Sequence, residues 1–178
     1  MLLSHDELVE LVNNGVIENV ALENINSASI DITLGGLILS ERCVNGEITL
    51  CKREPLEMEE ISITEDYGYT LKPGAFILAQ TEQVFNLPNN ISAEYKLKSS
   101  MARVGLNHAL AGWCDAGWNG SVLTMELMNV TKHHSIKLYK GDKIGQMIFF
   151  KHKEVAADKS YSTRGRYNKD TTVQGVKK

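Results

Sequence analysis

Residues 75–97 read AFILAQTEQVFNLPNNISAEYKL and contain two short apolar segments, Ala75–Gln80 and Ile91–Leu97. Between them lies Leu87-Pro88-Asn89-Asn90. Short apolar segments bounded by Pro and Asn are typical of β-strands joined by a turn, because proline fixes φ and asparagine tolerates turn conformations. The stretch therefore predicts two strands of a sheet.

The same alternation of apolar segments and turn residues continues along most of the chain. Ser29–Leu34 alternates apolar and polar residues and is expected to end at Gly35-Gly36, as a half-buried strand does. Further strands are expected at Val122–Val130, Ser135–Leu138 and Ile144–Phe150. Turns are expected at Lys72-Pro73-Gly74, Asn119-Gly120 and Lys140-Gly141-Asp142. This pattern predicts a mainly β fold, an antiparallel barrel or sandwich, and not alternating strands and helices.

One short helix is expected near the N-terminus. Ser4 and Glu7 have the spacing of a capping box, Leu8 and Leu11 begin an apolar stripe, and Asn13-Asn14-Gly15 ends it. Elsewhere the helical period is almost absent. The helix is therefore an accessory to the sheet.

The chain has 178 residues, and a length like this buries roughly 70% of the unfolded surface, enough for a single domain over residues 1–178. Residues 41–68 are more acidic and less periodic, which indicates an excursion from the sheet. Residues 151–178 hold eight Lys and Arg against three acidic residues. They are interpreted either as a disordered end or as a mobile lid that closes over an anionic ligand.

Composition excludes several classes of function. The net charge of −3 and the pI of about 6.0 argue against nucleic-acid binders and polybasic membrane binders, since both need a positive field. No apolar run could cross a membrane, and charges near the N-terminus disagree with a signal peptide, so a cytoplasmic location is expected. Cys43, Cys51 and Cys114 form no C-x-x-C pair, which fits free thiols and no zinc site.

The first candidate motif is Lys98–Arg103, KSSMAR. Two serines that cap a short helix at the end of a strand present hydroxyls, free backbone N–H groups and a guanidinium group together. Such a set can hold phosphate groups. The alternative is an ordinary helix cap beside a surface arginine.

The second candidate motif is residues 111–120, AGWCDAGWNG, in which three glycines predict a tight hairpin. Asp115 lies between Trp113 and Trp118. Its carboxylate either forms an Asx turn with the local backbone or meets a sugar hydroxyl or an activated water.

The third candidate is Glu126, the one carboxylate in the apolar run Val122–Met128. The run predicts a strand buried on both faces. A buried glutamate is tolerated only when it is paired or protonated, so Glu126 is a candidate general acid and base. A salt bridge inside an oligomer interface is the alternative.

Together the motifs resemble those of the dCTP deaminase family in the trimeric dUTPase-like superfamily. The resemblance rests on K-S-S-M-A-R-x-G, A-G-W-x-D-x-G-W-x-G, L-x-M-E-L and K-G-D-K-I-G-Q, in this order. It extends over most of residues 25–175 and includes Ile25–Asp31, Leu34-Gly35, Phe149-Phe150, Arg166-Tyr167 and Gln174-Gly175. It implies a dUTPase-like fold, a distorted antiparallel β-barrel or jelly roll, in a homotrimer whose sites lie between subunits.

The resemblance implies hydrolytic deamination of dCTP to dUTP and ammonia, with Glu126, Arg103 and Ser99 as catalytic residues. One glutamate can take a proton from water and then deliver it to N3 and the leaving amine. Arg103 would hold Glu126 in place, while Ser99 and the backbone near Ala111 would hold the water. Mg²⁺ is expected to enter with the triphosphate, without zinc.

The resemblance also implies the residues that bind the substrate. Asp115 would meet the 3′-hydroxyl of the deoxyribose. The other expected contacts, to the water, the nucleotide and its phosphates, are Lys98, Ser100, Ala111, Thr124, Tyr161, Arg166 and Gln174.

Three other functions stay open. A bifunctional, dUMP-forming deaminase fits the hairpin Ala111-Gly112-Trp113 at least as well. A dUTP pyrophosphatase shares the fold, but residues 115–119 lack the tyrosine platform and nearby arginine usual in that class. A non-catalytic nucleotide-binding protein is disfavoured because all three implied catalytic residues are present. Zinc-dependent deaminases are excluded, because no cysteine follows the H-x-E of His152-Lys153-Glu154.

Overall fold

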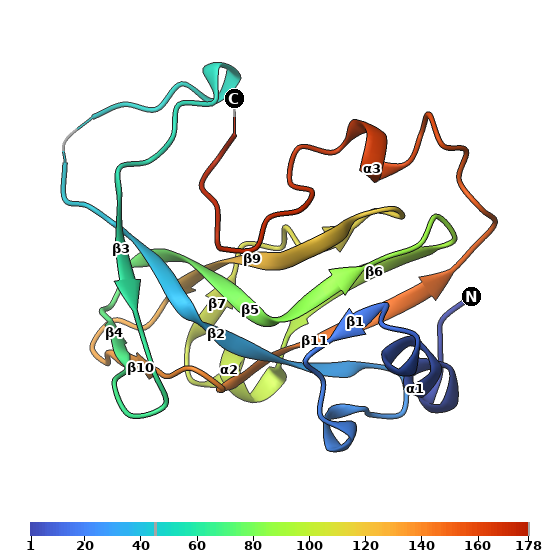
Figure 1. The fold of residues 1–178 in the computed structure, drawn as a ribbon. Helices are drawn as coiled ribbons and strands as arrows, with labels where there is room; N and C mark the ends of the chain where they lie inside the picture. The colour runs from blue at the N-terminus through green and yellow to red at the C-terminus, as the bar shows by residue number, and fades with distance from the viewer. Residues whose placement is uncertain (45, 178) are drawn as a thin grey trace.

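The computed structural model describes residues 1–44 and 46–177 and consists mainly of antiparallel strands (Figure 1). Lys178, the last residue of the expected lid, lies outside this range. The strands are β1 (Ile17–Glu18), β2 (Ile30–Glu41), β3 (Met58–Ser62), β4 (Tyr69–Leu71), β5 (Phe76–Asn86), β6 (Ile91–Leu97), β7 (Leu106–His108), β8 (Trp113–Cys114), β9 (Asn119–Asn129), β10 (Ile136–Leu138) and β11 (Lys143–Lys151). The helices are α1 (His5–Asn13), α2 (Ser99–Arg103) and α3 (Tyr161–Arg164), with 3-10 turns η1 (Leu22–Asn24) and η2 (Leu50–Lys52).

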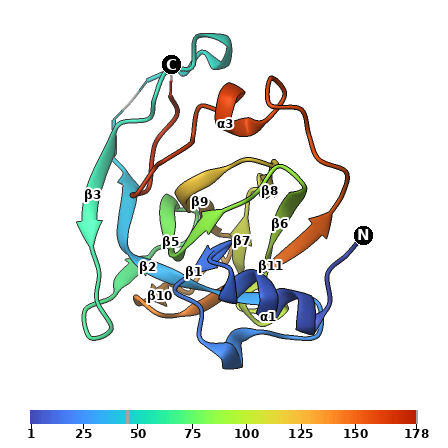
Figure 2. The same cartoon turned by 45° about the vertical axis from the view of Figure 1, so that its right-hand side comes forward.

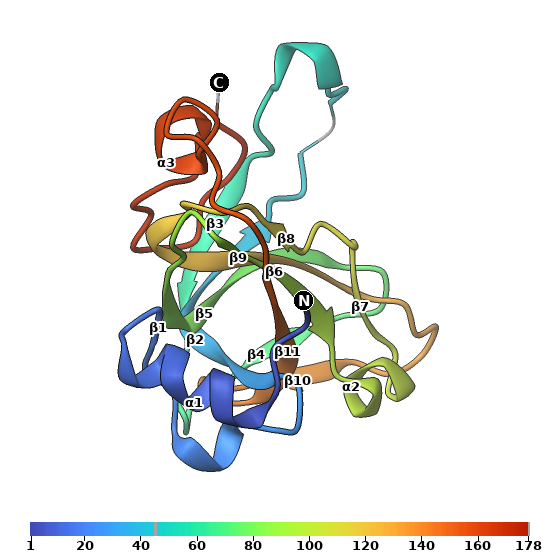
Figure 3. The same ribbon diagram turned by 90° about the vertical axis from the view of Figure 1, so that its right-hand side faces the viewer.

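One nine-stranded sheet carries the fold. Its order is β7-β9-β5-β2-β11-β6-β8, with β1 beside β5 and β3 beside β2, while β4 and β10 form a separate pair. Figure 3 shows the sheet curling into a half-barrel. The mainly β, antiparallel fold and the short N-terminal helix are thus confirmed. None of the helices in the described part of the chain is long and apolar enough to cross a membrane.

Several predicted element boundaries hold and others are wrong. β6 spans the predicted residues, and α1 begins with the predicted capping box, in which Ser4 N–H donates to Glu7 Oε2 at 2.9 Å. β2 continues through Gly35 instead of ending there. A Cβ at Gly35 would lie 2.9 Å from the carbonyl oxygen of Thr81, so glycine here lets β2 pass close to β5. The register of the two strands shifts between Leu34 and Ile38, as a bulge requires.

Two further expectations need correction. Asn119-Gly120 begins β9 and is not a turn, since the chain reverses earlier, at Ala116-Gly117. Gly117 has φ +87°, and a Cβ there would overlap the hydroxyl of Ser160. The excursion is shorter than predicted, because Met58–Ser62 already forms β3 and pairs with β2. We call residues 42–57 the β2–β3 loop.

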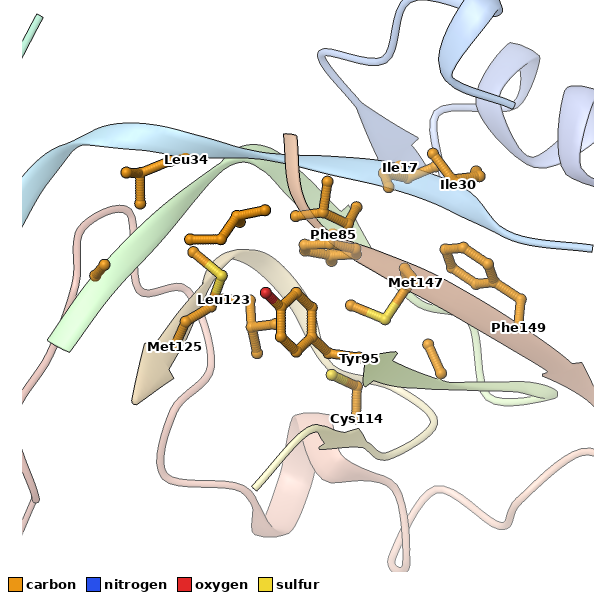
Figure 4. Packing of buried hydrophobic residues seen from close by; sticks show 14 of the residues in the cluster. Ile17, Ile30, Leu34, Phe85, Tyr95, Cys114, Leu123, Met125, Met147 and Phe149 are labelled. Atoms are coloured by element: carbon orange, nitrogen blue, oxygen red, sulfur yellow. The ribbon is translucent and has the colours of Figure 1, made fainter. Parts of the chain in front are cut away.

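The core lies inside the curl of the sheet. Figure 4 shows Leu123 and Met125 of β9 among the side chains that fill it. Side chains alternate along a strand, so Glu126 lies on the opposite face of β9. The prediction that β9 is buried on both faces is therefore wrong: its second face borders a cavity.

Candidate active site

A cavity of about 570 Å³ lies between β9, β8, the β2–β3 loop and the end of the chain, and this size suits a nucleotide-sized ligand. Six of the residues expected to form the site line it: Ala111, Asp115, Thr124, Glu126, Tyr161 and Gln174. No cluster of His, Cys, Asp and Glu able to hold a metal ion occurs within residues 1–44 and 46–177. The structure thus gathers residues from the hairpin, β9 and the C-terminal residues at one place.

Glu126 is held at the inner wall of the cavity. It lies opposite Leu78 in the pairing of β9 with β5. Its side chain is 27% exposed, so the expectation of a wholly buried carboxylate is corrected. Its Oε2 is buried and accepts no hydrogen bond from the residues that the structure describes. One carboxylate oxygen therefore faces the protein interior.

His108 faces this buried oxygen and was missed in the sequence. Its Nε2 lies 3.4 Å from Glu126 Oε2, and the side chain is 4% exposed. The ring of Tyr95 packs edge-on against the imidazole, with 4.8 Å between ring centroids. Burial, and secondarily the nearby Glu126, raises the pKa of Tyr95. No sequence spacing marks His108, because it reaches Glu126 only through the pairing of β7 with β9, where it lies opposite Leu127.

Asp115 follows β8 and lies at the mouth of the cavity. Its Oδ1 accepts a hydrogen bond from Trp113 Nε1 at 2.9 Å. The turn that follows is closed by the backbone, because Trp118 N–H donates to the carbonyl of Asp115 at 3.2 Å. The Asx-turn interpretation is therefore wrong, and the carboxylate is available to a ligand. Cys114, between Trp113 and Asp115 in the chain, is buried, and burial raises the pKa of its thiol to about 12.

The short loop that carries Ala111 is fixed on both sides. Ala109 N–H donates to the carbonyl of Glu126 at 3.1 Å, and Tyr95 N–H donates to the carbonyl of Gly112 at 2.8 Å. A Cβ at Gly112 would collide with the Tyr95 carbonyl. Ala111 is thereby presented at the cavity on a loop that is tied to both β9 and β6.

The C-terminal tail, described over residues 152–177, crosses above β9 (Figure 2). Val122 N–H donates to the carbonyl of Asp170 at 2.9 Å, and Gln174 N–H donates to Thr124 Oγ1 at 3.1 Å. Burial raises the pKa of Tyr161. Arg166 is exposed and does not line the cavity. The tail thus forms one wall of the cavity, and Thr124 contacts the tail.

The residues of the KSSMAR motif do not lie at this cavity. Figures 1 and 3 place α2 at the end of the molecule opposite α3 and the tail. Lys98 is the N-cap, so the predicted serine cap is wrong: Ser99 and Ser100 are the first residues of the helix. The side chains of Ser99, Ser100 and Arg103 are exposed and make no hydrogen bond or ion pair to the described residues. Within one chain, Arg103 is therefore not a partner of Glu126.

The start of α2 is held by a buried carboxylate. Asp31 accepts hydrogen bonds from Lys98 Nζ at 2.6 Å, from Asn26 at 2.9 Å and from Gln146 at 3.4 Å. Burial would raise the pKa of Asp31, but these hydrogen bonds and the Lys98 charge outweigh it, and the net shift is downward. The carboxylate therefore ties α2 to β2 and β11.

Comparisons with known proteins show the family of the chain. A family model described as dCTP deaminase-like matches residues 2–152. A protein of Nanoarchaeum equitans named dCTP deaminase, dUMP-forming, is 36% identical over 191 residues, covering 96% of this chain and 93% of its own length. A protein of the same name from Methanosphaerula palustris is 35% identical over 155 residues, covering 84% of this chain and 81% of its own length.

A solved structure shares the fold. The crystal structure of 2′-deoxycytidine 5′-triphosphate deaminase from Agrobacterium tumefaciens superposes with a TM-score of 0.66 at 20% identity, over 83% of this chain. The chain spans 47% of the length of that protein. At this identity the likeness shows the dUTPase-like fold alone.

Proposed function

Since the chain belongs to the dCTP deaminase family, we propose that it deaminates dCTP and then removes diphosphate, with dUMP as the product. The observation that carries the proposal is that Glu126 and Asp115 line one cavity. The sequence motifs favoured dUTP as the product, with dUMP as the alternative. The relatives are named as dUMP-forming enzymes, which supports that alternative better.

In the first step, Glu126 takes a proton from water as the water oxygen attacks C4 of cytosine. The proton passes from Glu126 to N3. Glu126 then moves the proton of the new C4 hydroxyl to the amine, so that the C4–N bond breaks, ammonia leaves and C4 becomes the carbonyl carbon of dUTP. His108 supports this role, because an imidazole on the inner oxygen of Glu126 leaves the outer oxygen directed to the cavity. The backbone near Ala111 is fixed well enough to orient the attacking water.

In the second step, Asp115 takes a proton from a second water. The oxygen of that water forms a bond to the α-phosphorus, the bond to the bridging oxygen breaks, and diphosphate leaves. Mg²⁺ would enter with the substrate, because a hard cation prefers oxygen ligands such as those of a triphosphate. Asp115 suits this step because its carboxylate is exposed at the mouth of the cavity.

The activity is tested with dCTP and Mg²⁺ in a purified preparation. The expected products are ammonia, dUMP and diphosphate in equal amounts. Release of dUTP instead of dUMP would restrict the function to deamination. Hydrolysis of added dUTP without ammonia from dCTP would identify a dUTP pyrophosphatase, and tight binding without turnover would identify a nucleotide-binding protein.

The KSSMAR motif is proposed to serve the cavity of a second copy in a homotrimer. The side chains of Ser99, Ser100 and Arg103 are exposed and lie away from the cavity of their own chain. Three exposed apolar residues, Val104, Met128 and Val130, lie beside them, and such a patch is typical of an interface. Ser99 and Arg103 of one subunit would then act beside Glu126 of another.

Mixing two inactive variants tests this arrangement. Arg103→Ala and Glu126→Gln are each expected to be inactive, whereas trimers formed from an equal mixture should regain activity. When neighbouring subunits share each site, about one site in four combines an intact Arg103 with an intact Glu126. Ammonia release by co-refolded protein is the measurement, and each variant refolded alone is the control. A mixture no more active than the separate variants would place the complete site in one chain.

A further inference from the structure

The indole of Trp113 is the one hydrogen-bond donor that the described residues supply to the carboxylate of Asp115. The bond runs from Nε1–H to Oδ1 at 2.9 Å and spans two positions in the chain. A bond from a neutral donor to a charged acceptor is stronger than one between neutral groups. This contact therefore has a part in fixing where the carboxylate points.

Packing within one chain does not explain Trp113. Its side chain is 58% exposed, whereas Trp118 is 6% exposed and stacks on Phe85 with 5.2 Å between ring centroids. Trp118 belongs to the core, but Trp113 leaves most of a large apolar ring in solvent. An exposed indole contributes little hydrophobic stabilisation, so its N–H is the distinguishing feature.

The indole is held from two directions. The backbone of Trp113 pairs with Glu94 across β8 and β6. Its ring lies against Phe150 of β11, at 6.0 Å between centroids and a tilt of 32°. The backbone pairing and the ring contact together orient the Nε1–H group towards Asp115, so the donor is preorganised.

The carboxylate of Asp115 can face either of two hollows. It lines the large cavity together with Trp113, and it also lines a second hollow of about 380 Å³ that Trp113 does not border. Lys159 and Arg164 line that second hollow and would attract a carboxylate. A side chain free to rotate among its staggered positions could turn towards them. The indole bond keeps Oδ1 on the side of the large cavity.

We propose that Trp113 is a positioning residue for Asp115 in diphosphate removal, and that it thereby decides how much dUTP is converted to dUMP before release. The inference rests on the proposed function. Trp113 keeps its own proton throughout. The proton from water goes to the carboxylate of Asp115, and the bond that breaks is the one between the α-phosphorus and the bridging oxygen.

Trp113→Phe tests the inference, because it keeps an aromatic ring against Phe150 and removes the donor. With dUTP as substrate, kcat for dUMP formation is expected to fall about 10–100-fold, the usual worth of a hydrogen bond to a charged group. KM should change little. With dCTP as substrate, ammonia release should fall far less, so that dUTP accumulates.

Two variants complete the experiment. Trp113→His returns a ring N–H at the corresponding position, and at pH 8, where an ordinary imidazole is neutral, it should recover part of dUMP formation. Tyr67→Phe removes a polar group from an exposed aromatic ring outside the cavity and should behave as the parent protein.

Two results would overturn the inference while leaving the proposed function intact. In the first, Trp113→Phe still forms dUMP at the parental rate. In the second, it loses ammonia release and dUMP formation equally, and Trp113→His restores neither. A parent protein that releases only dUTP would overturn both the second step and the inference.

Discussion

Glu126→Gln is expected to lower ammonia release from dCTP by about 10²–10⁴-fold, a barrier increase of roughly 3–5 kcal/mol. Glutamine keeps the volume and most hydrogen bonding of glutamate, but it cannot accept and return a proton. Because β9 and its pairing with β5 need only the backbone of Glu126, the fold should persist. The loss should therefore appear in kcat, measured from ammonia with saturating dCTP, and not in the circular dichroism spectrum.

Glu60→Gln is the matched control. Glu60 is exposed on β3, and it does not line the cavity. The same chemical change there should leave ammonia release within experimental error of the parent protein. Full deamination by Glu126→Gln would mean that another residue moves the proton.

Asp115→Asn should separate the two proposed steps. An amide cannot take the proton of the attacking water, so dUMP formation should fall by about 10²–10⁴-fold. Deamination depends on Glu126 and should continue in part, so dUTP should accumulate from dCTP. Chromatographic separation of the nucleotides over a time course measures both steps at once.

Asp66→Asn, an exposed change outside the cavity, controls for altered charge. Continued dUMP formation by Asp115→Asn would remove Asp115 from the role of base. A higher KM for dCTP with an unchanged product would instead assign it to the sugar hydroxyl alone.

The alternation of apolar and polar side chains predicted strands where one face of the sheet packs against the core. Ile91–Leu97 matched β6 for this reason. Side-chain alternation did not predict that β2 continues through Gly35. This continuation depends on the close approach of Thr81, which is distant in sequence. The second face of β9 was misjudged because an apolar run cannot distinguish a buried face from the wall of a cavity.

The motifs around Asp115 and Glu126 led to the cavity because each motif is continuous in sequence. His108 could not be found in that way, since only the pairing of β7 with β9 brings it to Glu126. The sequence of the KSSMAR motif also does not show whether the motif contributes to the cavity of its own chain or to that of another copy. That depends on how copies of the chain assemble.

The burial of Cys114 has a practical consequence for chemical labelling. Its thiol pKa is raised to about 12, so at neutral pH it is neither reactive nor accessible, whereas Cys43 and Cys51 are exposed. With Cys43 replaced by serine, a maleimide dye would attach at Cys51 alone. Cys51 follows Leu50, which lines the cavity, so the dye would be attached one residue from the cavity wall without altering Glu126 or Asp115. The chain thus carries its own attachment point for a fluorescent reporter of nucleotide binding.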